Sequence, residues 1–476
     1  MGYGDRSTRG ERLCAPLPGR AVRRLVLHRE TRRAGRVLQL CHTAGDRLVH
    51  GAALNYYLAN AGDGVNRAAL AGDITTDVCV VGGGIAGCSA ALHLAERGYR
   101  VTLLEAERVG FGASGRSGAQ AIFGFACGQA KLEQQVGADA ARQMWDVSLQ
   151  GLGLLREVID RHQIDCGYVS GQMHVAIKPR HEQELRAEVD ELRNRYDYQS
   201  VRYLQQDETR SLIASKRYTG ALLDSNSGHL QPLKYTRGLA AAAERAGTRI
   251  HEKSRVVALD AGAGATTPSR VRTATGTVTA QHVVLCGNAL LGALVPQLAR
   301  KIMAVGTYIV ATQVLGEERV RGLIANNAAV TDINWVLDYF RRSADHRLLF
   351  GGRVSYSGLD AFSSANATRS RLLAVFPQLR DAPIEFAWGG YVDITMSRAP
   401  HFGRLAPNAY FLQGFSGHGI ALTGIAGKLV AETIAGTAER FDLFARLPHA
   451  DFPGGSLLRR PALVLAMLYY RLRDVL

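Results

Sequence analysis

Three glycines at fixed spacing, Gly82, Gly84 and Gly87, follow a short run of mostly β-branched residues. This G-x-G-x-x-G pattern is typical of the turn between a buried strand and a helix that binds the pyrophosphate of a dinucleotide. The first glycine allows the tight turn, the second lets the phosphates approach the backbone, and the third lets the helix pack closely on the strand. The pattern predicts a dinucleotide site; the alternative is a glycine-rich turn without a ligand.

An acidic residue follows the next predicted strand. The helix is expected over 85–97, ending before Gly98, and the second strand over 100–104, directly before Glu105. A carboxylate at this position accepts hydrogen bonds from the adenosine ribose. The glycine pattern alone is weak, but the strand before it, the helix after it and this acid agree.

Two further glycine-rich stretches are suited to binding a ligand with their backbone. Residues 108–120 contain four glycines and two serines, which suits a loop that folds closely around a ligand, although a flexible surface loop is the alternative. Residues 410–423 predict a strand ending at Gln413, a glycine-rich turn and a helix running to about Ile434. The N-terminus of that helix would stabilise an electron-rich group.

Composition places these motifs in an ordinary two-domain globular chain. The chain has 476 residues, 47% of them hydrophobic and 21% charged. No apolar run approaches the roughly 18 residues that span a bilayer. Seven widely spaced cysteines contain no C-x-x-C, which argues against a disulfide framework, a common zinc site or a redox dithiol and favours the cytoplasm.

The net charge of +15 is concentrated at the start, since residues 1–50 hold eleven arginines against four acidic residues. A basic arm could bind nucleic acid or anionic lipid. It has little aromatic interleaving and no recognisable nucleic-acid module, so we expect a disordered extension over 1–54 and no nucleic-acid partner.

The remaining pattern predicts an α/β protein. Helices are expected at 131–163, 180–196 and 232–246, and strands at 168–177, 249–259, 282–286, 306–313 and 348–354. The strands after residue 301 are far from the glycine motif and are expected to form a second domain.

With these motifs in place, the chain resembles the FAD-dependent oxidoreductases of the D-amino-acid-oxidase type, and among them the bacterial γ-glutamylputrescine oxidase branch. The resemblance covers roughly residues 55–476. It is carried by VGFGASGR at 109–116, DYFR at 338–341, FGGRVSY at 350–356, WGG at 388–390, RAP at 398–400, GFSGHG at 414–419 and LPH at 447–449.

The resemblance implies a Rossmann-type FAD-binding domain of the glutathione-reductase kind and a substrate domain built on an antiparallel or mixed β-sheet. The FAD-binding domain is expected at 74–165, 226–300 and 391–445, the substrate domain at 166–225 and 301–390, and a C-terminal tail or helix at 446–476.

The resemblance also assigns site residues. Contacts with non-covalent FAD are expected from Gly82, Gly84, Ile85, Ala86, Gly87, Glu105, Ala106, Gly112, Ala113, Ser114, Gly115, Arg116, Ser117, Gln120, Val256, Gly287, Gly417, His418, Gly419 and Thr423. Roles in catalysis or substrate orientation are expected from His418, Tyr339, Arg398, Tyr308, Trp335 and Trp388, with aromatics for an alkyl chain or ammonium and Arg398 for a carboxylate. No metal is expected.

The implied reaction is hydride transfer from the carbon bearing an amine to the flavin N5, followed by hydrolysis of the imine. The products are an aldehyde or keto acid, ammonia and, with oxygen as acceptor, hydrogen peroxide. Two features depart from the family. Residues 115–120 read GRSGAQ, whereas the branch often has GRNGGQ. Related sarcosine oxidases use a lysine over the flavin to promote reaction with oxygen, but this chain has no lysine between Lys301 and Lys428.

Three readings therefore remain. The first is a flavin amine oxidase, or a dehydrogenase that passes electrons to a carrier instead of oxygen. The second is a pyridine-nucleotide-linked flavin reductase, which would need a second nucleotide motif and usually a redox dithiol. The third is an RNA-associated protein that binds through residues 1–50.

Overall fold

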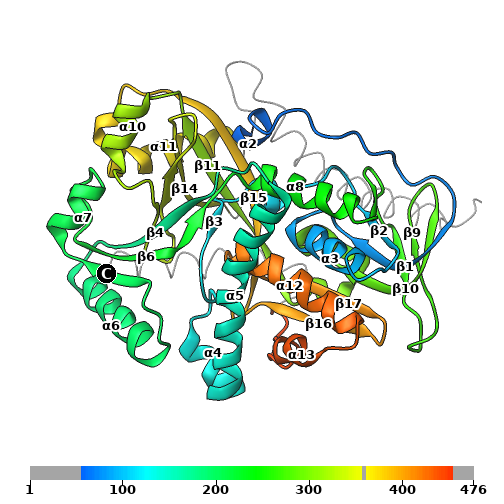
Figure 1. Ribbon diagram of the computed structural model, residues 1–476. Helices are drawn as coiled ribbons and strands as arrows, with labels where there is room; N and C mark the ends of the chain where they lie inside the picture. Colours follow the sequence, from blue (N-terminus) through cyan, green and yellow to red (C-terminus); the bar gives the residue numbers. More distant parts are fainter. Residues whose placement is uncertain (1–54, 356–360, 454–476) are drawn as a thin grey trace, which may run out of the picture. The chain divides into compact units, whose positions relative to one another are not determined.

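The first of two sheets is built around the strand that precedes the glycine motif. The computed structural model describes residues 55–355 and 361–453 (Figure 1). The sheet has the order β16-β17-β10-β1-β2-β7, and β1 (Ile74–Val81) pairs in parallel with β2 (Val101–Leu104) and β10 (Thr277–Leu285). The remaining strands are β7 (Arg249–His251), β8 (Ala258–Asp260), β9 (Ser269–Arg272), β16 (His401–Ala406) and β17 (Ala409–Gln413). The parallel centre agrees with the predicted Rossmann-type sheet.

A layer of helices covers one face of this sheet. Every residue of α3 (Ile85–Ala95) is buried, and α3 packs against α8 (Pro232–Arg245) and α12 (Gly419–Ile434) in one hydrophobic core (Figure 1). The long helix α5 (Ala138–His162) packs on α12, with α4 (Gln129–Val136) and α13 (Glu439–Ala445) at its side. Since α3 and α12 follow the two glycine-rich turns, both helix N-termini are fixed by the same core.

The second sheet is mixed, as predicted, and has the order β15-β11-β14-β13-β12-β4-β6-β3, with β5 on β6. Among the described strands of this second sheet, only β12 and β4 pair in parallel. The strands are β3 (Gln120–Ala121), β4 (Val169–Ala176), β5 (Val201–Leu204), β6 (Gly220–His229), β11 (Ile302–Thr312), β12 (Ala329–Asp332), β13 (Tyr339–Arg342), β14 (Leu348–Ser355) and β15 (Ile384–Thr395).

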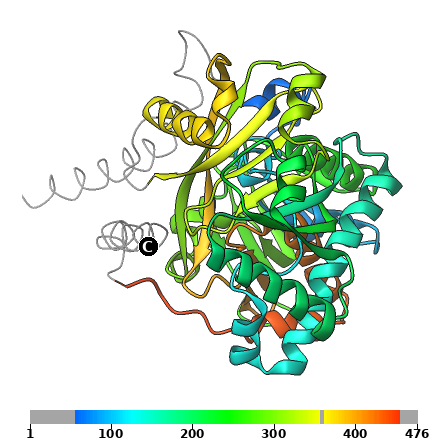
Figure 2. The same ribbon diagram turned by 90° about the vertical axis from the view of Figure 1, so that its left-hand side faces the viewer.

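The two faces of this sheet differ in what covers them. On one face Phe340 and Phe350 pack into a core with α11 (Ala361–Val375), and α10 (Glu317–Leu323) and α7 (Gln206–Leu212) lie on the same side. At the β4–β6 end of the other face lies α6 (Pro179–Arg195) (Figure 2). It packs there through Leu185 and Val189. Because side chains alternate along a strand, Met173 and Val175 face the first core and His174 faces the second side.

Short helical turns complete the described chain. They are α2 (Tyr56–Ala59), α9 (Pro296–Ala299) and the 3₁₀ turns η1 (Ala113–Gly115), η2 (Asn288–Leu294) and η3 (Pro377–Leu379). The predicted extension over 1–54 and the residues beyond 453 lie outside the described residues.

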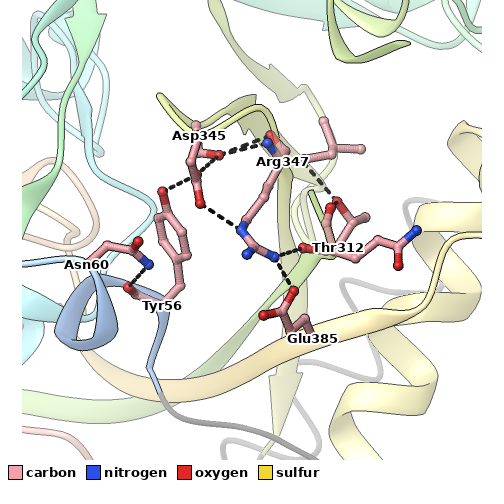
Figure 3. A network of polar contacts seen from close by, with 9 residues as sticks. Tyr56, Asn60, Thr312, Asp345, Arg347 and Glu385 are labelled. Atoms are coloured by element: carbon pink, nitrogen blue, oxygen red, sulfur yellow. Dashed lines mark hydrogen bonds and ion pairs between the residues drawn. The ribbon is translucent and has the colours of Figure 1, made fainter. Parts of the chain in front are cut away.

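Helix α2 is anchored to the second sheet by a polar network (Figure 3). The Tyr56 hydroxyl donates to Asp345 at 2.5 Å, and Arg347 pairs with Asp345 at 2.7 Å. Arg347 also contacts Glu385 and donates to the Thr312 carbonyl at 2.8 Å. The Arg347 side chain is only 9% exposed. Since its carboxylate partners remain partly accessible to solvent, we expect this network to fix the position of α2 more than to stabilise the fold.

One predicted strand is wrong and several boundaries shift. The strand expected over 249–259 is divided into β7 and β8, because Lys253 adopts a positive φ of 51° and the Ser254 N–H donates to the Glu105 carbonyl instead of a sheet partner. The helix expected over 85–97 ends at Ala95, and Gly98 follows with φ 86°. Strand β3 pairs with β6 of the second sheet although residues 120–121 were assigned to the FAD-binding segment, and β15 extends to Thr395.

Candidate active site

The glycine motif has the geometry that each glycine was expected to supply. Gly82 adopts φ 111°, and a Cβ there would lie 2.8 Å from the Cys286 carbonyl oxygen. A Cβ on Gly87 would lie 1.9 Å from the Gly82 carbonyl oxygen, and one on Gly84 would lie 2.8 Å from the Ser114 hydroxyl. These three positions of the turn are therefore closed to any side chain of their own.

The N-terminus of α3 has an anion-binding arrangement. Hydrogen bonding within the helix begins where the Cys88 N–H donates to the Gly84 carbonyl, so the N–H groups of Ile85, Ala86 and Gly87 precede the ladder. The Ile85 N–H has no acceptor within the helix and instead donates to the Ser114 hydroxyl at 3.0 Å. An oxygen atom thus already fits at this amide, as a phosphate oxygen would.

Glu105 lies at the end of β2, beside this turn. Its carboxylate accepts hydrogen bonds from the Gly83 N–H at 2.7 Å and the Glu107 N–H at 2.9 Å. Burial raises the pKa of Glu105 above its ordinary value, and these two N–H groups favour the charged form. A carboxylate accepts up to about four hydrogen bonds, so capacity remains for ribose hydroxyls. Ala106 follows directly, and the predicted adenine contact Val256 lies in the connection between β7 and β8.

The loop after β2 returns to the glycine turn and then approaches the second sheet. The Gly110 N–H donates to the Gly83 carbonyl at 2.9 Å, and Ala113, Ser114 and Gly115 form η1. Arg116 accepts at its carbonyl from the Trp388 indole N–H at 3.0 Å. Trp388 is 2% exposed, and its indole supports this loop. Its expected contact with substrate stays a prediction. Gln120 is held by Thr331 and by the Val330 carbonyl of β12.

Two side chains at the start of α2, those of its N-cap residue Asn55 and of Tyr57, hold this loop and were missed by sequence reasoning. Asn55 donates from Nδ2 to the Gly115 carbonyl at 2.9 Å, and the Tyr57 hydroxyl donates to the Ser117 carbonyl at 3.0 Å. Arg341 of β13 donates to the Tyr57 oxygen at 3.1 Å and to the Gly118 carbonyl at 3.2 Å. All three side chains are buried. The loop conformation therefore depends on residues distant from it in sequence.

We predict that Asn55→Ala weakens FAD binding about 10-fold, because the loop loses one buried hydrogen bond and the Gly115 carbonyl loses its partner. The measurement is titration of the FAD-stripped protein with FAD. Asn60→Ala is the control, since Asn60 bonds only within its own helix turn, to the Tyr56 carbonyl at 2.9 Å. Equal FAD affinity in the two variants would show that Asn55 does not hold the loop.

The late glycine-rich turn lies between β17 and α12, as predicted. Gly414, Ser416 and Gly417 all adopt positive φ. The Gly414 N–H donates to Asn288 Oδ1 at 3.1 Å, which joins this turn to the residues that follow Gly287. The backbone of His418 caps α12, and Gly419 and Thr423 occupy its first turns, where the Thr423 hydroxyl donates to the Gly419 carbonyl. Helix α12 also contacts β3 (Gln120–Ala121), at the end of the loop 112–120.

His418 lies near Arg398, in the connection between β15 and β16, and near His174 of β4. Burial first, and then the charges of Arg398 and His174, lower the pKa of His418 to about 4, so the imidazole is neutral near pH 7. Its Nδ1 has no hydrogen-bond partner among the described residues. The Arg398 guanidinium lies 5.4 Å from the ring centre of Trp335. The structure therefore brings His418, Arg398 and Trp335 together, and His174 is an addition that sequence reasoning missed.

The other two predicted aromatics lie elsewhere on the second sheet. Tyr339 packs between Gly118 and Gly351, where added Cβ atoms would lie 2.6 and 2.2 Å from its ring, and burial raises its pKa while a hydrogen bond with Thr307 opposes the rise. The Tyr339 ring thus packs against the loop at Gly118. Tyr308 of β11 packs against Gly389 of β15, where an added Cβ would lie 3.1 Å from its ring.

The described part of the chain contains no group of three or more His, Cys, Asp or Glu side chains arranged to hold a metal ion. No described helix is by itself long and apolar enough to cross a membrane, although α12 and α13 together, bent by 118°, pass that test on length and composition.

Comparison with known proteins gives consistent results. Residues 77–433 match the family described as FAD dependent oxidoreductase. The chain is 44% identical over 421 residues to gamma-glutamylputrescine oxidoreductase of Escherichia coli, covering 88% of this chain and 98% of that protein. It is 40% identical to a probable oxidoreductase OrdL of Haemophilus influenzae, covering 84% and 92%. Glycine oxidase from Bacillus cereus has the same fold, with a TM-score of 0.63, 22% identity, and coverage of 79% and 99%.

Proposed function

Since this chain belongs to the family of FAD-dependent oxidoreductases, we propose that it oxidises a small amine by hydride transfer to the flavin, with γ-glutamylputrescine as its substrate. The choice of substrate rests on the 44% identity to the Escherichia coli enzyme, which extends over 98% of that protein. The alternative within the same chemistry is a dehydrogenase that delivers electrons to a carrier.

The residues around the glycine motif fit FAD. The absence of side chains at Gly82 and Gly84 would let the pyrophosphate approach the backbone, and the start of α3 would supply its N–H groups. The Glu105 carboxylate can accept further hydrogen bonds, which the hydroxyls of the adenosine ribose would donate. When bound, FAD supplies the hydride acceptor, N5 of its flavin ring.

The late turn and the loop 112–120 would hold the flavin end. The start of α12 offers a positive dipole end that favours negative charge at the pyrimidine side of the reduced ring. Tyr339 and Arg341 fix the opposite side of the loop through Gly118. We assign the segments 74–165, 226–300 and 391–445 to FAD binding on this basis, with the substrate domain between them.

His418 would accept a hydrogen bond from the substrate. Its imidazole is neutral, and its Nδ1 is without a described partner. Hydride transfer requires an uncharged amine, and the neutral imidazole would accept a hydrogen bond from the N–H of that amine and so orient it. The aldehyde then arises when water hydrolyses the imine, with release of ammonia.

We also propose the cellular compartment in which the reaction takes place. The described cysteines Cys79, Cys88, Cys127, Cys166 and Cys286 are all free, which supports a reducing compartment such as the cytoplasm.

Product analysis tests the function. The purified yellow protein is incubated aerobically with γ-glutamylputrescine, and the aldehyde, ammonia and hydrogen peroxide are quantified. We expect equimolar aldehyde and ammonia, with peroxide in the same amount if oxygen is the acceptor and turnover only with an added dye acceptor if a carrier is used. Absence of aldehyde with either acceptor would refute the proposed function.

A further inference from the structure

A buried carboxyl group without a partner lies near the end of β15, where this strand meets the late turn. Asp393 is 2% exposed. Neither of its carboxyl oxygens has a hydrogen-bond partner among the described residues. Buried carboxyl groups are nearly always hydrogen-bonded, because an unpaired one loses its hydration without compensation. An orphaned group of this kind indicates a ligand that would bind it.

The side chain of Asp393 is on the side of β15 that faces the late turn. Alternate residues of a strand point to the same side, and the pairing of β15 with β11 is regular here, so Asp393 shares its side with Thr395. A Cβ added to Gly414 would lie 2.5 Å from the Thr395 Cγ2, which places this side against the turn. The Asp393 backbone is held there as well, since its carbonyl accepts from the Ser416 N–H at 2.9 Å.

The segment that follows Gly287 lies beside Asp393 too. The Gly414 N–H donates to Asn288 Oδ1 at 3.1 Å, and η2 contacts both β15 and β17. The Ala289 N–H is near enough to favour the charged form of Asp393, but burial has the larger effect and raises the pKa of this carboxyl well above its ordinary value. Gly287 and the late turn both belong to the proposed FAD site, so Asp393 lies next to two of its segments.

The flavin half of FAD has groups that suit a buried carboxyl. Its ring presents carbonyl oxygens, ring nitrogens and an N–H, and its ribityl chain presents hydroxyls. A carboxyl that keeps its proton can donate one hydrogen bond and still accept others, so it fits either kind of group. The late turn is the part of the proposed site that would hold this half, through the start of α12.

We propose that the Asp393 carboxyl group hydrogen-bonds to the flavin half of bound FAD and helps to hold the ring in position for hydride transfer. This inference rests on the proposed function, which places the flavin at the late turn. It gives β15, a strand of the second sheet, a direct part in cofactor binding. It also explains why an unpaired carboxyl is kept in the interior: the group lowers the stability of the FAD-free fold and gains its partner when FAD binds.

The test replaces Asp393 with an apolar residue that suits a strand. For Asp393→Val we expect the affinity for FAD to fall about 10- to 100-fold, the range for one or two lost hydrogen bonds in a buried site. The stability of the FAD-free protein should stay the same or rise, because valine removes a buried polar group that has no partner. Asp393→Asn, which can still donate and accept, should bind FAD within about 3-fold of the wild type.

Urea unfolding of the full chain at several concentrations of FAD measures both quantities. The midpoint for protein stripped of its cofactor reports the stability of the fold, and the rise of the midpoint with added FAD reports the affinity. A parallel series uses ADP, which lacks the flavin half. Wild type and Asp393→Val should respond equally to ADP.

Asp224→Val is the matched control. Asp224 of β6 is as buried as Asp393, but its carboxyl accepts from the Tyr198 hydroxyl at 2.8 Å and from the N–H groups of Asn226 and Ser227 at 3.0 Å. Its loss should give the opposite pattern, which is a lower midpoint without FAD and an unchanged affinity for FAD. Asp224→Asn, which keeps one acceptor oxygen, takes its place if the valine variant does not fold.

The outcomes separate cofactor binding from a structural role. Equal FAD affinity in wild type and Asp393→Val overturns the proposal. A joint fall of stability and affinity also overturns it, because Asp393 would then hold the fold, and so does an equal loss of affinity for FAD and ADP. No amine enters these measurements, so failure of the proposed amine chemistry would show only in the product analysis and would leave this result standing.

Discussion

Gly87→Ala is expected to yield a protein that lacks FAD and has lost much of its stability. The new Cβ would lie 1.9 Å from the Gly82 carbonyl oxygen and 3.3 Å from a Val80 side-chain carbon. The first contact is with backbone, so no side-chain rotation relieves it, and α3 must move away from β1. Overpacking in cores typically costs about 1–3 kcal/mol, and a backbone clash belongs at or above the upper end of that range.

The loss of FAD follows from the same displacement. The Gly82 carbonyl and the first turn of α3 belong to the turn that would enclose the pyrophosphate, so a shift of the helix separates its N–H groups from the phosphates. The measurements are the FAD-to-protein ratio by absorbance and the unfolding curve in urea. Gly153→Ala in α5 is the control, since nothing lies within 4 Å of its added Cβ, and it should raise stability by about 0.5–1 kcal/mol. Retention of FAD by Gly87→Ala would contradict the close packing that we describe.

Glu105→Ala should weaken FAD binding by at least about 100-fold. The variant loses the charge-assisted hydrogen bonds to the ribose, each of which is worth roughly 1.5–3 kcal/mol. It also removes the acceptor of the Gly83 and Glu107 N–H groups, so the turn itself is less well held. The dissociation constant is measured by titrating the stripped protein with FAD.

A neighbouring acid provides the control for Glu105. Glu107 pairs with Arg255 at 2.9 Å and remains partly accessible to solvent, so Glu107→Gln should bind FAD nearly as the wild type does. A comparable loss in both variants would indicate a general effect of negative charge rather than ribose recognition. FMN, which has no adenosine, gives a second readout: its affinity should change far less in Glu105→Ala than that of FAD.

The parts of the fold that local patterns encode were predictable from the sequence. The strand, turn and helix around Gly82 are specified by β-branched residues, glycine spacing and the acid at Glu105, all within about thirty residues of one another. The late turn at Gly417 was predictable for the same reason. The family resemblance also predicted the loop 112–120 beside the flavin and the mixed second sheet.

Contacts between distant segments were not predictable. Asn55 and Tyr57 hold a loop 60 residues later in the chain, and Tyr57 meets Arg341 across 284 residues. Nothing in the residues around Asn55 marks it as a partner of the Gly115 carbonyl. Asp393 likewise meets Ser416 of the late turn only because β15 of the second sheet ends beside that turn. The prediction of one continuous strand over 249–259 was wrong because a positive φ at Lys253 turns the chain towards Glu105.

The central claim is that this chain oxidises an amine with its own bound flavin, and anaerobic mixing tests it most directly. The purified protein is mixed with γ-glutamylputrescine in the absence of oxygen, and the visible absorption band of the flavin is followed. We predict complete bleaching with one equivalent of aldehyde formed per flavin. Bleaching by NADPH but by no amine would contradict the account and make the protein a pyridine-nucleotide-linked reductase.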